Sequence, residues 1–150
     1  MEIYRSASLQ SQFSGFDYFK EKKVISFKKI NDSEYNGQVK GNNKIYDVFI
    51  NVEHPKKYSH CNCPLAEGKK IICKHMVALY FEIFPEKAKQ FLNEIDEHKK
   101  EVDEYERELE IKLRKYIKNM DREELENSLL DCLYQVEWLY DKFIRDKVGY

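Results

Sequence analysis

Residues 61–84 read CNCPLAEGKKIICKHMVALYFEIF, and the character of the chain changes within them. The first part places three cysteines and one histidine in the pattern C-x-C-x9-C-x-H. From Cys73 onward the apolar residues recur at helical spacing, which predicts a helix. They occupy two sides of it, Val77, Tyr80, Phe81 and Phe84 on one and Met76, Leu79 and Ile83 on the other. A helix that is apolar nearly all round must be covered on more than one side.

The four clustered residues predict a metal site. Three thiolates and one imidazole are the donor set that zinc takes in closed, tetrahedral structural sites. Cys61 and Cys63 can face one ion if they leave a strand at a bend, and Pro64 marks such a bend. Residues two apart inside a helix lie on nearly opposite sides, so Cys73 should precede the helix and His75 should lie in its first turn. Gly68 gives the intervening loop the freedom to turn back. We therefore predict a structural Zn²⁺ held by Cys61, Cys63, Cys73 and His75.

Other interpretations of this cluster stay open. The cysteines could be unpaired core residues beside a surface histidine, although four cysteines in the whole chain are too few for a disulfide scaffold. His60 could replace His75 as a ligand, but it is adjacent to Cys61 and on a strand would point to the opposite face. His54 better suits a solvent-facing end of a strand.

The sequence gives no indication of catalysis. A catalytic zinc keeps one position open and usually has three protein ligands, whereas four good donors close the shell. The chain also lacks the H-E-x-x-H, G-x-S-x-G, Walker-type and dinucleotide-binding patterns, and it has only five glycines. We therefore predict a protein that is not an enzyme. The fourth cysteine, Cys132, is predicted to be a small buried side chain in a helix.

Strand-like runs precede the cysteines. Residues 24–30, 34–40 and 44–52 are separated by Asn31-Asp32-Ser33 and Gly41-Asn42-Asn43, which are typical of turns. Residues 57–63 could form a fourth short strand. Phenylalanines at positions 13, 16 and 19 indicate a short helix, and the first dozen residues read as loosely ordered. The sequence thus predicts an α+β fold, in which a small antiparallel β-meander carries a zinc-bound ββα finger.

Helical spacing continues beyond Pro85. Residues 86–119 carry an apolar seam at heptad spacing, and Asp121 and Glu124 form a helix start signal before a last helix with a similar seam. Two seams of matched length joined by a tight break predict a C-terminal antiparallel helical hairpin. The seams consist of Phe91, Ile95, His98, Val102, Tyr105, Leu109, Leu113, Tyr116 and Met120, and of Leu125, Leu129, Cys132, Val136, Tyr140 and Phe143.

This hairpin predicts two units, a zinc-binding module at residues 1–84 and a helical hairpin at residues 85–150. Strands can cover only one side of the helix after Cys73, so we expect the hairpin to dock on the other side. Leu130, Tyr134 and Trp138 form a second apolar stripe, which either docks on the Met76, Leu79 and Ile83 side or binds a partner. The long seam could alternatively close between two chains and form a homodimer.

The C-x-C-P…C-K-H-M-V-A-L-Y run resembles a SWIM zinc finger, whose pattern is C-x-C, a variable gap, and C-x-H at a helix start. The similarity extends upstream through Gly15-Phe16-Asp17-Tyr18-Phe19, residues 37–41 and Tyr46-Asp47-Val48, and covers about residues 13–84. All four ligand positions of the family are filled. The resemblance implies a ββα zinc fold that binds DNA or proteins, and does not say which.

The two halves of the chain differ in net charge. Residues 1–84 hold 13 basic and 9 acidic residues, whereas residues 85–150 hold 13 and 18. Five lysines surround the cluster and could contact phosphates, with Tyr58 able to stack on a base; they are Lys56, Lys57, Lys69, Lys70 and Lys74. Because no arginine lies between Arg5 and Arg107, we expect weakly sequence-specific DNA binding. The alternatives are a solvated basic rim and an adaptor that binds proteins.

Composition sets the broad class. An apolar share of 42% with 14% aromatic residues can build a core despite 35% charged residues, which argues against a disordered chain. No apolar run approaches the roughly 18–20 residues that span a bilayer, and the first residues do not form a signal peptide. From the sequence we expect a cytoplasmic protein without a membrane partner.

Overall fold

A computed structural model describes residues 2–149 and confirms the α+β class. The chain divides into two compact units, Met1–Ile95 and Asp96–Tyr150. The docking of a C-terminal unit on the zinc module stays a prediction. Among the described residues, no helix combines the length and the apolar character needed to cross a membrane.

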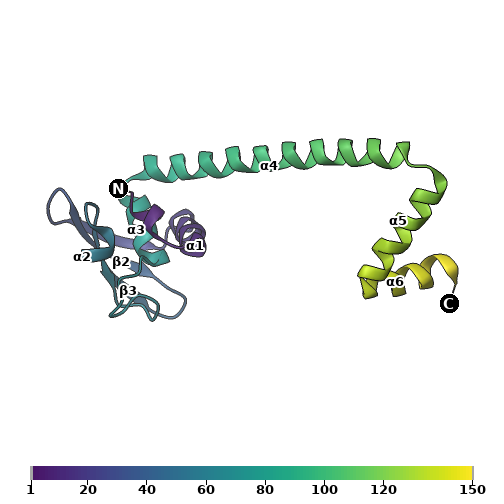
Figure 1. The fold of residues 1–150 in the computed structure, drawn as a ribbon. Coiled ribbons are helices and arrows are strands. Elements are labelled where there is room, and N and C mark those ends of the chain that lie inside the picture. Colours follow the sequence, from purple (N-terminus) through teal and green to yellow (C-terminus); the bar gives the residue numbers. More distant parts are fainter. Residues whose placement is uncertain (1, 150) are drawn as a thin grey trace. The chain divides into compact units, whose positions relative to one another are not determined.

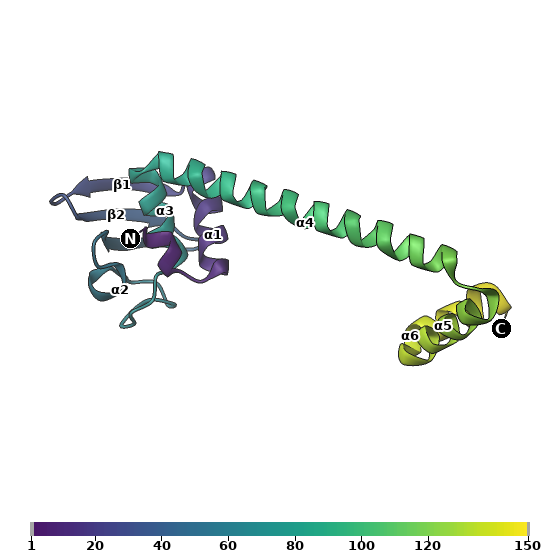
Figure 2. The ribbon, with the colours of Figure 1, turned by 45° about the horizontal axis from the view of Figure 1, so that its top comes forward.

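The first unit contains the predicted meander (Figures 1 and 2). Four antiparallel strands follow one another in the sheet: β1 (Val24–Lys29), β2 (Glu34–Lys40), β3 (Ile45–Asn51) and β4 (His60–Cys61). The predicted turns lie where expected. The Asn31 side chain accepts a hydrogen bond from the backbone N–H of Ser33 at 3.0 Å, and the Gly41 N–H donates to the Lys44 carbonyl at 2.8 Å. The fourth strand is shorter than predicted, because α2 (Pro55–Tyr58) occupies the start of that segment.

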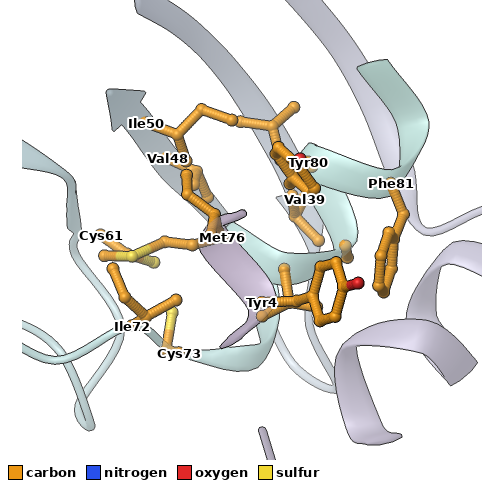
Figure 3. Packing of buried hydrophobic residues seen from close by; sticks show 14 of the residues in the cluster. Tyr4, Val39, Val48, Ile50, Cys61, Ile72, Cys73, Met76, Tyr80 and Phe81 are labelled. Atoms are coloured by element: carbon orange, nitrogen blue, oxygen red, sulfur yellow. The ribbon is translucent and has the colours of Figure 1, made fainter. Parts of the chain in front are cut away.

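Helix α3 (Lys74–Ile83) forms the centre of this unit and lies between the sheet and α1 (Leu9–Lys20), as Figure 1 shows. Val39, Val48 and Ile50 of the sheet are fully buried near α3 (Figure 3). On the other side, a Cβ atom on Gly15 of α1 would lie 2.5 Å from the Cβ of Val77. The two helices can therefore cross this closely only because position 15 has no side chain.

The structure corrects one expectation and shows what covers α3 within the first unit. Residues 2–12 are not loosely ordered: a 3₁₀ helix at Ile3–Ser6 (η1) is followed by α1, and Ile3 and Tyr4 are 0% and 1% exposed. The second side of α3 is covered mainly by α1 and η1. From the C-terminal half, the first turns of α4 (Pro85–Asn119) contribute Ala88 and Phe91 to the same core. The burial of η1 depends on contacts distant in sequence, so local composition did not reveal it.

Glu2 connects the N-terminal segment to α4 through an ion pair with Lys87. Its carboxylate accepts hydrogen bonds from Lys87 at 2.6 Å, Arg5 at 2.7 Å and the Tyr4 hydroxyl at 2.8 Å. Burial alone would raise the pKa of Glu2, but these three donors outweigh it and lower the pKa from 4.5 to about 2. A carboxyl whose pKa is depressed in the folded state stabilises the fold above its unfolded pKa.

Replacing Glu2 with glutamine is therefore expected to lower the free energy of unfolding by about 2 kcal/mol at pH 7. In the wild-type protein this contribution should disappear as pH falls from about 4.5 to about 2, where the carboxyl takes up its proton. Urea unfolding at several pH values measures both effects. Equal stability of the two proteins at pH 7 would contradict the prediction, as would a difference that persists at pH 2.

The second unit contains the rest of α4, then α5 (Arg122–Gln135), α6 (Glu137–Phe143) and a π-helical turn at Ile144–Val148. The predicted start signal is a complete capping box. The Asp121 side chain accepts from the Glu124 N–H at 2.8 Å, and the Glu124 side chain accepts from the Asp121 N–H at 3.2 Å.

The structure differs from the predicted hairpin in two respects. The last helix is interrupted at Val136, whose extended backbone, φ −132° and ψ 92°, ends α5 and begins α6. No proline or glycine marks this break in the sequence. Seam residues also lie exposed instead of packing a hairpin closed; among them are Val102, Tyr105, Leu109, Leu113, Tyr116, Leu125, Leu129 and Tyr140. Cys132 is exposed too, so its predicted burial is wrong.

Candidate metal centre

The C-x-C segment is held against the sheet by backbone pairing. Cys61 lies opposite Val48 in the β3–β4 ladder, which turns its side chain to the inner face of the sheet. The Asn62 side chain accepts a hydrogen bond from the backbone N–H of Asp47 at 3.0 Å and so fixes the residue between the two cysteines. Cys63 follows immediately where the strand has ended, as the bend at Pro64 predicted.

The loop between the cysteines turns back on itself. The Cys63 carbonyl accepts hydrogen bonds from the N–H groups of Ala66 at 3.0 Å and Glu67 at 2.9 Å. Gly68 follows with φ +70°, a left-handed conformation that glycine adopts without steric cost. Cys73 is then the N-cap of α3, and His75 lies in the first turn, as predicted.

These elements bring one ligand atom from each of Cys61, Cys63, Cys73 and His75 to within 4.8 Å of one another. His75 Nδ1 lies 3.8 Å from Cys61 Sγ and 3.9 Å from Cys73 Sγ. Metal–ligand distances of 2.0–2.3 Å in a tetrahedron place neighbouring donors about 3.5–3.8 Å apart. All four residues are buried, so the spacing and the donor set both fit a closed zinc site.

The three thiols differ in how readily each loses its proton. A hydrogen bond from Cys61 lowers the pKa of Cys73 to about 4, with further help from His75 and the Met76 N–H at the start of α3. The same interaction raises the pKa of Cys61. Burial raises the pKa of Cys63. A divalent ion would have to displace the protons of Cys61 and Cys63, and once bound it would stabilise all three thiolates.

Two tyrosines hold the His75 ring. Tyr46 of β3 stacks on it with ring centroids 4.4 Å apart, and Tyr18 of α1 meets it edge-on at 5.4 Å. His75 Nε2 is buried and has no hydrogen-bond partner among the described residues, whereas Nδ1 faces the sulfur atoms. The packing therefore directs Nδ1 toward the position that a metal would take.

Comparison with known protein families agrees with this geometry. Residues 57–83 match the family model of the SWIM zinc finger. This segment resembles a SWIM zinc finger. The match is shorter than the similarity expected from the sequence, which began near residue 13. No curated protein and no solved structure matches the chain. The SWIM match and the Cys3His cluster together establish a zinc-binding protein.

The rival histidines lie away from the cluster. His60 pairs with Phe49 on the outer face of the sheet, where the two rings stack at 4.9 Å, so it points away from Cys61 as expected. His54 is exposed and precedes α2, with its ring against Tyr58. In the described chain, His75 is thus the histidine that lies with the three cysteines.

The five lysines come from three segments of the finger. Lys56 and Lys57 lie in α2, Lys69 and Lys70 in the loop, and all four are exposed. Lys74 begins α3 and is half-buried, because its ammonium group lies 4.5 Å from the centre of the Tyr18 ring. Tyr58, the candidate stacking residue, is 45% exposed, with the Lys57 ammonium 4.8 Å from its ring.

A hollow of about 770 Å³ lies beside the cysteine cluster. Lys74 and His75 line it together with polar residues that the sequence analysis did not single out, namely Ser8, Gln10, Ser11, Ser14, Asn42 and Asn43. Asn42 and Asn43 were predicted to form a turn, and Tyr46, which also lines the hollow, was predicted to lie on an alternating strand. Neither pattern indicates that these residues lie close to the loop between Cys63 and Cys73. Ser8 and Ser11 belong to the segment that the sequence analysis expects to be loosely ordered, and Ser14 to the short helix that follows it.

Proposed function

We propose that one structural Zn²⁺ is held by Cys61, Cys63, Cys73 and His75, and that the zinc-bound finger binds nucleic acid. We further propose that the protein is not an enzyme. The buried donor set carries the first part of the proposal, since its spacing fits a closed tetrahedral site. Bound zinc would join β4, the loop and the start of α3, and so fix the segments that carry the lysines.

The exposed lysines support the second part. Lys56, Lys57, Lys69 and Lys70 present ammonium groups to solvent on segments adjoining the cluster, where they can neutralise phosphates. The hollow beside the cluster adds serine and asparagine side chains, which can donate hydrogen bonds to phosphates or sugars. Lysine lacks the planar fork with which arginine reads guanine, so binding should depend weakly on sequence.

The test is fluorescence anisotropy of labelled single- and double-stranded DNA with zinc-loaded protein, titrated with salt. We expect log K to fall linearly with log salt concentration, with a slope of about three to five, because a similar number of phosphates is neutralised. Absence of binding at low salt would overturn the nucleic-acid proposal and leave the zinc assignment intact.

A charge variant localises the contact. Changing Lys69 and Lys70 to glutamine is expected to reduce the salt slope by about two and to weaken binding similarly for different DNA sequences. Lys142→Gln with Lys147→Gln is the matched control, since it removes the same charge from exposed positions in the second unit. Equal losses in the two variants would mean that net charge, and not the finger, determines binding.

The second candidate function is an adaptor that recruits proteins. Tyr134 and Trp138 are 69% and 68% exposed on α5 and α6, and Leu130 is also exposed. Exposed large aromatic residues are typical anchors of protein interfaces. If DNA does not bind, the next test is capture of a protein partner by the wild-type chain. Replacing Tyr134 or Trp138 with alanine should then weaken that capture.

A further inference from the structure

The second unit has almost no core of its own. Of its described residues, Leu133 alone is buried, at 5% exposure. Helices in water gain most of their stability from packing an apolar face and little from intrinsic propensity. Residues that could supply such a face are exposed along α4, namely Val102, Tyr105, Leu109, Leu113 and Tyr116.

These five residues form one continuous stripe on α4. At 3.6 residues per turn, positions 102, 105, 109, 113 and 116 fall within an arc of about 80° around the helix axis. An arc of this width matches the seam along which two helices pack. Tyr105 and Tyr116 are 63% and 66% exposed, so two large rings on this seam lie mostly in solvent.

The charge along α4 indicates what covers the stripe. Residues 96–110 hold eight acidic and three basic side chains, whereas residues 111–119 hold four basic side chains and no acidic one. One flank of the stripe carries Glu101 and Glu108 in the first part, then Lys112 and Lys115 in the second. In a reversed copy centred at Leu109, residues 111–119 would lie along residues 99–107, which hold four acidic and three basic side chains. The complementarity is therefore strongest on the flank, where the lysines of one helix lie toward the Glu101 end of the other.

We propose that α4 binds α4 of a second copy of this chain in antiparallel orientation, with the stripe as its seam. A two-fold axis near Leu109 places Val102 opposite Tyr116 of the second copy, and Glu101 near Lys115 of the second copy. A parallel pair would align acidic with acidic and basic with basic residues, at an energetic cost. The proposal concerns the second unit and does not depend on zinc or DNA binding.

Sedimentation equilibrium of the zinc-loaded full chain tests the association. We expect a monomer–dimer equilibrium whose Kd rises at least about tenfold in Leu109→Glu, which places a charge at the centre of the seam. Lys112→Glu with Lys115→Glu should also weaken the dimer, because the flank of the stripe then carries acidic side chains at all four positions. A monomeric wild-type chain would overturn the proposal, and the stripe would then serve a different protein.

A compensating variant separates charge pairing from general damage. Adding Glu101→Lys and Glu108→Lys to the two lysine changes reverses the polarity of the flank and should restore the wild-type Kd. Far-UV circular dichroism shows whether each variant keeps its helix. Failure of the fourfold variant to dimerise while it remains helical would overturn the proposed complementarity.

Single cysteines report the orientation in a Cys132→Ser background with zinc bound. Chains with Val102→Cys should form disulfide-linked dimers when mixed with chains carrying Tyr116→Cys, because these positions are opposite each other in the antiparallel pair. Rapid cross-linking of Val102→Cys chains to one another, with little mixed product, would mean a parallel pair and overturn the proposal.

Discussion

Replacing Cys63 with serine is expected to lower the midpoint of thermal unfolding of the first unit by about 15 °C. A structural zinc contributes binding free energy directly to folding, and a serine hydroxyl is a much poorer ligand than a thiolate. The loss should be about 3 kcal/mol, because the unit retains the core formed by α1, α3 and the sheet. Metal analysis should find about one zinc per wild-type chain and less in the variant.

The natural control is the fourth cysteine. Cys132 is exposed in the second unit, so Cys132→Ser should leave zinc content and the unfolding midpoint of the first unit unchanged. A chelator should reproduce the effect of Cys63→Ser in the wild-type protein and in the Cys132→Ser variant. If the Cys63→Ser variant were as stable as the wild type, the cluster would not be a structural metal site.

The parts of the fold that the sequence predicted correctly depend on local patterns. The order and turns of the strands follow from alternation and from residues such as Gly41. The metal cluster follows from ligand spacing, because two residues on a strand and a residue pair at a helix start have defined relative geometry. The opposite orientations of His60 and Cys61 follow from the same alternation.

What the sequence did not predict depends on contacts distant along the chain. Ile3 and Tyr4 are buried by helices from elsewhere in the first unit, among them α3 and α4, whose Phe81 and Phe91 rings pack on Tyr4. No local pattern marks a buried 3₁₀ turn. Tyr46 fits the alternation of apolar and polar residues on β3 like its neighbours. Its stacking on His75, however, requires the loop between Cys63 and Cys73 to return to that strand. Heptad spacing in α4 correctly indicated an apolar seam but could not specify which surface covers it.

The aromatic centre of the first unit gives a second large effect that is independent of the metal. Phe81 is fully buried beside Tyr4, with the two ring centroids 5.4 Å apart (Figure 3). Its ring centroid also lies 5.5 Å from that of Phe91 and 6.0 Å from that of Phe16. Replacing Phe81 with alanine removes a contact shared by η1, α1, α3 and α4. The expected cost is about 3–5 kcal/mol in the free energy of unfolding, comparable with the total stability of many domains.

Urea unfolding followed by near-UV circular dichroism measures this cost, with Phe27→Ala as the control because Phe27 is 49% exposed and should lose less than about 1 kcal/mol. At low urea, where it is still folded, the Phe81→Ala variant should keep its zinc, since Phe81 lies in the last part of α3 and the ligands flank its start. A loss as small as that of the control would mean that the N-terminal segment does not close over α3. Loss of both stability and zinc would mean that α3 cannot present Cys73 and His75 unless its far end is packed, which would make the core a condition for metal binding.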